Sequence, residues 1–379
     1  MEEASRTRAS FSRRVLNGLL LCSGDMEHLD KYMKDKSFVL QLAVCGLRGV
    51  TRVILANNPL SGGLILAALY WASPWQGLLG TLGVLASTLT AVITGQDSVE
   101  VAGGHHGFNG MLVSLLMGVY SSAGDWYWWL LLPVFLGSAT CVFLFSGLSS
   151  FLDRWDLPAA VFPFNIIIIL YLLCTGPEHP YFPHHSIKPP GALETIETIK
   201  TDYEINVLSV IRGIPLGVGQ IFACGDLGPS LLILGAVFLY SPLLAVHALL
   251  GSAVGTLTGL SMAVRHESLY SGLSGFNGAL GCMAVGGFFI FSLWTHLFAI
   301  ASAFFSAYAD IALSNLMGTV GLPACSWAAT LVATLMLLLT GSLAAYRIPT
   351  GQVRAPERNL QLRSQWEAGN TEERESADV

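Results

Sequence analysis

The tetrapeptide Gly107-Phe108-Asn109-Gly110 occurs a second time as Gly275-Phe276-Asn277-Gly278, 168 residues later in the chain. Three further matches share this offset: Leu64-Ile65-Leu66 with Leu232-Ile233-Leu234, Ser73-Pro74 with Ser241-Pro242, and Thr88-Leu89-Thr90 with Thr256-Leu257-Thr258. One match between leucine-rich segments carries little weight, whereas four matches at a single shift indicate an internal repeat. The chain is therefore predicted to consist of two homologous halves.

The composition places both halves in a membrane. Of the 379 residues, 53% are hydrophobic and only 12% are charged, whereas a soluble domain carries about 25% charged residues. Residues 38–175 and 206–345 together hold 13 of the 44 charged side chains in 278 residues. This distribution excludes a soluble enzyme and a nucleic-acid-binding protein, and it predicts an all-α polytopic membrane protein.

Apolar segments predict about ten transmembrane helices, five in each half. They are 38–56, 59–73, 75–95, 126–149 and 157–174, followed by 206–223, 229–240, 242–262, 287–314 and 323–345. Two further apolar pieces, 105–120 and 271–286, contain the repeated tetrapeptide near their starts and are predicted half-helices. An odd number of spans inverts one half relative to the other, and proteins built this way hold their site between the repeats. A site near the midplane between the repeats is therefore expected.

The charges of the flanking segments predict the orientation. We expect an N-terminal tail (1–37), a first repeat (38–175), a linker (176–205), a second repeat (206–345) and a C-terminal tail (346–379). The two tails carry seven and five Lys or Arg residues, whereas the linker carries only Lys188 and Lys200. By the positive-inside rule, both tails are predicted to be cytoplasmic and the linker extracellular.

Two kinds of residue in the spans are candidates for function. Phe108 and Phe276 would line a flat slot, edged by backbone carbonyl groups of broken helices, that suits a small planar polar molecule. The alternative is that Phe and Gly only pack the helices closely. Charges at membrane depth cost about 3 kcal/mol and are functional candidates; here they are Arg48, Arg52, Arg212, Asp226 and Asp310.

Two of these charges have specific alternatives. Arg52 is the repeat equivalent of Gln220 at the offset of 168, so the pair would occupy matching places about the centre. Alternatively, Arg52 reaches a membrane interface. Asp310 either belongs to a site, marks the end of a span or pairs with an arginine.

The sequence offers no pattern for catalysis. The pairs His105-His106 and His184-His185 are weak metal-site candidates, because adjacent residues on a helix do not face the same way. There is no phosphate-binding loop, nucleophile elbow or HExxH motif. We therefore expect no cofactor, no metal and no enzymatic activity.

Several runs of residues resemble the urea transporters of vertebrates, in order over roughly residues 25–350. They are Leu47-Arg48-Gly49, Asn57-Asn58-Pro59-Leu60-Ser61-Gly62, Gly124-Asp125, Trp155-Asp156-Leu157-Pro158, Pro163-Phe164-Asn165 and Val320-Gly321-Leu322-Pro323-Ala324-Cys325. The resemblance implies a homotrimer in the plasma membrane, surrounded by lipid, with a separate pore in each protomer. Each half would contribute five spanning helices and a tilted half-helix. Urea would move passively and flat through a narrow filter of aromatic and aliphatic side chains and oxygen atoms.

Carried over residue by residue, the resemblance implies a filter with slots at Phe108, Leu112, Phe276 and Leu280, and with Val53 and Ile221 near the centre. The chain departs from the family at several of these positions. The amide expected in the first half is Arg52, whereas the second half keeps Gln220. An aromatic residue is replaced by Leu55, and of two central hydroxyl positions one is Val161 and the other is Ser326.

These departures leave three interpretations open. Glutamine can accept a hydrogen bond from urea, but arginine only donates, and an unpaired polar group in a dry site costs about 1–3 kcal/mol. The filter therefore either still conducts urea, or has moved to another small polar solute such as an amide, an amine or an anion, or no longer conducts. In the last two cases Arg52 would project into the pore, where its guanidinium group could act as a plug.

Overall fold

The computed structural model describes residues 21–188 and 205–360, and the described part of the chain is helical without any β-strand. A short helix, α2 (Glu27–Met33), precedes the first repeat. The first repeat comprises α3 (Phe38–Arg52), α4 (Pro59–Ala72), α5 (Pro74–Ile93), α6 (Ser98–Ala102), α7 (Gly107–Tyr120), α8 (Leu131–Leu152) and α9 (Phe162–Cys174). The second comprises α10 (Val207–Gln220), α11 (Leu227–Tyr240), α12 (Pro242–Ser261), α13 (His266–Tyr270), α14 (Phe276–Phe288), α15 (Leu293–Gly318) and α16 (Trp327–Leu337). The two sets correspond one to one, which confirms two homologous halves.

Most helices of each half are short for a membrane span. Within the described residues, four segments are long and apolar enough to cross a bilayer alone: Pro74–Ile93, Trp128–Trp155, Pro242–Ser261 and Leu293–Gly318. They form two pairs that are equivalent in the repeat. The other apolar helices of the repeats have 10–17 residues, and such broken segments are stable at membrane depth because neighbouring helices satisfy their ends.

Two predicted spans of the second half have different bounds in the structure. The span predicted at 287–314 is α15, which starts after Ser292 because the Ser292 and Thr295 side chains form a reciprocal cap. Asp310 therefore lies inside a helix and does not mark its end. The span predicted at 323–345 stops at Leu337, whose carbonyl group accepts a hydrogen bond from Arg347 Nη1 at 2.8 Å.

The repeated Ser-Pro pairs have the same structural role in both halves. Ser73 precedes α5 and accepts a hydrogen bond from the Gln76 amide, and Ser241 precedes α12 and accepts one from the Leu244 amide. Proline at the first helical position suits such a start because it has no N–H group to satisfy. The Ser-Pro match at offset 168 therefore corresponds to two equivalent helix starts.

The structure shows directly that the halves are inverted. Asn58, at the start of α4, donates from Nδ2 to the carbonyl oxygens of Cys22 and Gly24, both at 2.8 Å. Tyr240, at the end of α11, accepts from the Gly24 amide at 3.0 Å. Equivalent helices α4 and α11, which pack side by side, thus run in opposite directions.

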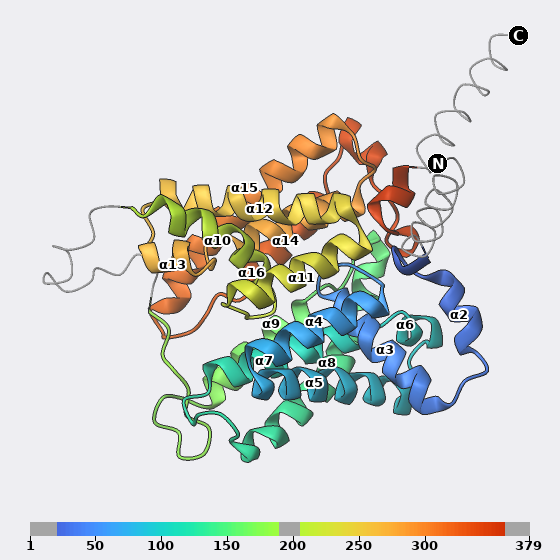
Figure 1. The fold of residues 1–379 in the computed structure, drawn as a ribbon, viewed down its shortest axis with the longest axis horizontal. Coiled ribbons are helices and arrows are strands. Elements are labelled where there is room, and N and C mark those ends of the chain that lie inside the picture. The colour runs from blue at the N-terminus through green and yellow to red at the C-terminus, as the bar shows by residue number, and fades with distance from the viewer. Residues whose placement is uncertain (1–20, 189–204, 361–379) are drawn as a thin grey trace, which may run out of the picture.

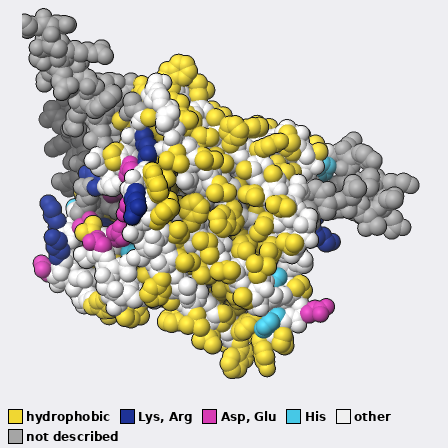
Figure 2. All heavy atoms as spheres, turned by 180° about the vertical axis from the view of Figure 1, so that it is seen from behind, with side chains coloured by type: hydrophobic (Ala, Val, Ile, Leu, Met, Phe, Trp, Pro, Cys, Tyr) yellow, Lys and Arg dark blue, Asp and Glu magenta, His cyan; other side chains and the backbone are white. Residues whose placement is uncertain are grey.

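The described parts of the tails lie at one end of the molecule and those of the linker at the other (Figure 1). At the first end, here called the tail end, Asp25 accepts hydrogen bonds from the Tyr240 hydroxyl and from the Ala355 amide. At the opposite end, here called the linker end, the Ile187 amide donates to the carbonyl group of Gly321. Figure 2 shows apolar side chains across one face between these ends, with most charged side chains near the tail end.

Candidate pore between the two repeats

The asparagine of each repeated tetrapeptide ties a half-helix to the start of a neighbouring helix. Asn109 donates from Nδ2 to Ala160 O at 3.2 Å and accepts from the Phe164 amide at 3.0 Å. Asn277 donates to Cys325 O at 3.0 Å and accepts from the Ala329 amide at 3.2 Å. These asparagines were not among the predicted site residues, although their repetition in the tetrapeptide was the available signal.

Arg52 and Gln220 make equivalent hydrogen bonds. Arg52 Nε donates to the carbonyl oxygen of Gly103 at 2.8 Å, and Gln220 Nε2 donates to that of Ser271 at 2.9 Å. Gly103 and Ser271 are themselves related by the offset of 168. Arg52 thus makes the same kind of hydrogen bond to the backbone in the first half as Gln220 makes in the second half.

A cavity of about 560 Å³ extends inward from the linker end. Lys188 and Ile187 lie at its outer part, and its wall contains eight of the eleven predicted site residues: Val53, Leu112, Val161, Gln220, Ile221, Phe276, Leu280 and Ser326. Residues from both halves therefore form the wall of this cavity. Arg52, Leu55 and Phe108 are not in this wall.

Of the three predicted site residues outside this wall, Arg52 is held by Gly103, and Leu55 and Phe108 pack against other groups of the protein. Leu55 has a positive φ of 61°, like its repeat equivalent Ala223 at 55°, and packs against the cluster that contains Phe288 and Phe289. Phe108 is 6% exposed and stacks edge to face with Phe145 at a centroid distance of 5.9 Å.

A buried amide connects the two halves and contacts two residues of the cavity wall, Val161 and Ser326. Asn165 Nδ2 lies 3.0 Å from Val161 O and 3.2 Å from Ser326 Oγ, and Asn165 Oδ1 accepts from the Ser326 amide at 3.2 Å. The retained hydroxyl group at Ser326 is thus held by a residue from the other repeat. Val161, the equivalent position, offers no hydroxyl group.

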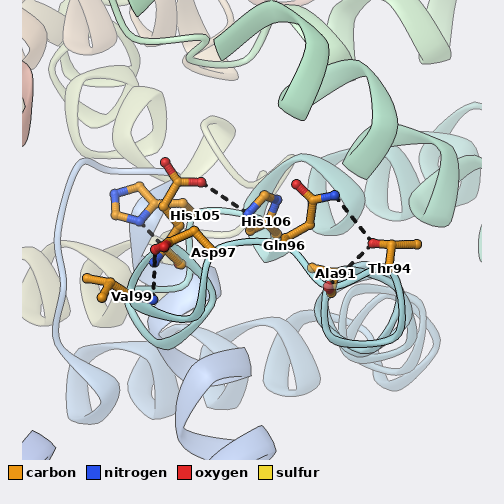
Figure 3. Close-up of polar contacts among 8 residues, drawn as sticks. Ala91, Thr94, Gln96, Asp97, Val99, His105 and His106 are labelled. Carbon is orange, nitrogen blue, oxygen red and sulfur yellow. Dashed lines mark hydrogen bonds and ion pairs between the residues drawn. The ribbon is translucent and has the colours of Figure 1, made fainter. Parts of the chain in front are cut away.

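The His105-His106 pair stabilises the turn between α6 and α7. His106 Nε2 lies 3.3 Å from a Glu100 carboxylate oxygen, and His105 Nδ1 lies 3.2 Å from the Glu100 carbonyl oxygen (Figure 3). Asp97 caps α6 by accepting from the Val99 and Glu100 amides. The described residues contain no group of three or more His, Cys, Asp or Glu side chains that could hold a metal ion.

The other charged candidates occupy different environments. Arg48 is 3% exposed, donates to Ala102 O at 3.1 Å and pairs with Asp30. Arg212 and Asp226 are exposed on the surface of the described chain. Asp310 is 8% exposed and lies in the cavity wall.

These features define a class of protein: a helical, multi-pass membrane protein with inverted repeats and a cavity between them. Comparison with known proteins specifies the family. The family model described as "Urea transporter" matches residues 43–341. The chain is 40% identical to Urea transporter 1 of Capra hircus over 349 residues, which is 92% of this chain and 90% of that protein. It is 42% identical to Urea transporter 1 of Rattus norvegicus over 339 residues, 89% and 87% of the two chains. The chain belongs to the urea transporter family.

Proposed function

We propose that the chain conducts urea passively through the cavity between its two repeats. The observation that carries this proposal is the equivalent pair of hydrogen bonds from Arg52 to Gly103 and from Gln220 to Ser271. Because Arg52 Nε is held by backbone, the side chain has a structural partner and need not fill the pore. The family and the relatives named Urea transporter 1 support urea as the solute.

The cavity wall offers groups that match the chemistry of urea. Phe276 and Leu280 provide apolar surfaces for the flat face of the molecule. Gln220 donates one N–H to Ser271, and its amide oxygen can accept from urea, which has four N–H donors. In this proposal no covalent step occurs, and the protein is not an enzyme.

The proposal extends to assembly and location. We infer a homotrimer in the plasma membrane, surrounded by lipid, with a pore in each protomer and with both tails cytoplasmic. The broad apolar surface between the two ends of the molecule agrees with a lipid environment (Figure 2). The boundaries of the tails and linker remain part of this proposal, and residues 1–20, 189–204 and 361–379 lie outside the described part of the chain.

The test is stopped-flow urea efflux from proteoliposomes that contain the natural chain or Arg52→Gln. We expect saturable flux in the natural chain and a change of less than about threefold in Arg52→Gln, because glutamine can keep the bond to Gly103. Arg52→Ala should reduce flux by about tenfold, since an unpaired buried carbonyl group costs about 1–3 kcal/mol. A silent natural chain with flux restored by Arg52→Gln would instead identify Arg52 as a plug.

Restoring the missing hydroxyl group should increase urea flux. Val161→Thr places a hydrogen-bonding group opposite Ser326, and about 1 kcal/mol of added stabilisation corresponds to roughly a fivefold rate increase. The same efflux assay measures the effect. Val246→Thr, an equivalent change at a 53% exposed position of α12, is the control and should leave flux unchanged. An unchanged or lower flux in Val161→Thr would show that the central hydroxyl groups do not limit permeation.

A further inference from the structure

Asp310 is a buried carboxylate without a cationic partner among the described residues. Its Oδ1 lies 3.4 Å from Ser314 Oγ, and the side chain of Asn277 lies beside it. No Lys or Arg of the described chain forms an ion pair with it, although its side chain is only 8% exposed. Because an unpaired buried charge is costly, a cation that enters the cavity would stabilise the ionised form of this carboxylate.

The other charged groups of the cavity wall lie in more exposed positions. Arg265 Nη1 and Glu267 Oε2 are 4.0 Å apart, with side chains 29% and 80% exposed, so these two charges largely offset each other. Lys188 is exposed at the outer part. Asp310 is therefore the most deeply buried of the four charges in the wall.

Asp310 also breaks the symmetry between the repeats. It belongs to α15, whose counterpart α8 contains no charged residue. The first half instead contributes a positive charge, Arg52, outside the wall of this cavity. A solute that enters from the linker end passes Lys188 and the Arg265–Glu267 pair in the outer part of the cavity and then reaches Asp310.

We propose that Asp310 makes the linker-end cavity a binding site for small planar cations of the guanidinium class, which plug the urea pathway from that end. Guanidinium has the flat, three-armed shape of urea, and a carboxylate accepts two parallel hydrogen bonds from it. The Phe276 ring in the same wall attracts a cation to its face. The positive charge of Arg52 opposes onward passage, so the cation blocks the pore. The blocking part of this inference rests on the proposed function.

The test measures urea flux in proteoliposomes with guanidinium chloride on one side of the membrane and sodium chloride at equal ionic strength as the reference. We expect saturable inhibition from the linker end, with a half-inhibitory concentration at least about tenfold higher in Asp310→Asn. Asp310→Glu, which keeps the charge, should retain most of the inhibition. Glu267→Gln removes a carboxylate from the outer part of the same cavity and is the matched control. Equal inhibition in the natural chain and Asp310→Asn would overturn the proposal.

Equilibrium binding of radiolabelled guanidinium to the purified full chain separates the two proposals. Saturable binding that Asp310→Asn weakens, in a chain without urea flux, would support the site and refute the urea channel. Urea flux without saturable guanidinium binding would refute the site and leave the channel intact. This second result concerns the natural chain alone, so it holds even if Asp310→Asn does not fold.

Discussion

Leu112→Trp should reduce urea flux by about a hundredfold while the protein still folds. Leu112 lies in the cavity wall, to which Val53 of the same half and Ile221 of the other half also belong. An indole ring at this position would fill space that the solute needs. A hundredfold loss corresponds to about 2.7 kcal/mol in the barrier for permeation, whereas overpacking costs about 1–3 kcal/mol of stability.

Stopped-flow efflux, normalised to the amount of reconstituted protein, measures this loss. Leu132→Trp is the control, because Leu132 lies in α8 with a 61% exposed side chain. The control should conduct like the natural chain, and both variants should elute as the natural chain does in size-exclusion chromatography. If a correctly folded Leu112→Trp conducted at the natural rate, the pathway would have to lie elsewhere in the protein.

Asn165→Leu should destabilise the protein and abolish most of its urea flux. Asn165 is fully buried and holds the Ser326 amide and hydroxyl groups, as well as the Val161 carbonyl group. Leucine has a similar size but leaves these groups without their partner. Each unsatisfied buried group costs about 1–3 kcal/mol, so we expect a loss of about 3–5 kcal/mol in stability.

Thermal unfolding in detergent and urea efflux together measure this effect. Thr330→Val is the control, since the Thr330 hydroxyl group makes only the longer 3.4 Å contact with Asn165 Nδ2 and a bond to the carbonyl oxygen of Ser326, the residue before α16. This variant should lose much less stability and retain most of its flux. Equal losses in the two variants would contradict the role assigned to the Asn165 amide in joining the halves.

The repeated residues were good predictors of architecture because their roles are local. Ser73 and Ser241 each start a helix through contacts within four residues. Their structural role could therefore be predicted from the neighbouring sequence. The bounds of α15 and α16 were less predictable. They depend on the reciprocal cap of Ser292 with Thr295 and on the distant side chain of Arg347, which apolar composition does not reveal.

Arg52 illustrates what sequence reasoning could not decide about the pore. The residue type gave only a charge and a set of donors, which fitted a filter, a plug or an interfacial side chain equally well. The structure supplies the acceptor, Gly103 O, which lies 51 residues away in the chain. Similarly, the partners of Asn165 in the other half are 161 and 165 residues distant, so its role in connecting the halves was not visible in its own segment.

The amino-acid sequence is enough to predict an all-α membrane protein of two homologous halves. Hydrophobic content and an offset of 168 suffice for that conclusion because they are properties of the chain. Three other features became visible only in the folded molecule: which side chains share the cavity wall, how Arg52 is held, and that Asp310 lies in this wall without a cationic partner among the described residues. These outcomes depend on contacts between helices from opposite repeats, and the free energy of a buried polar group depends on the partners that such contacts provide.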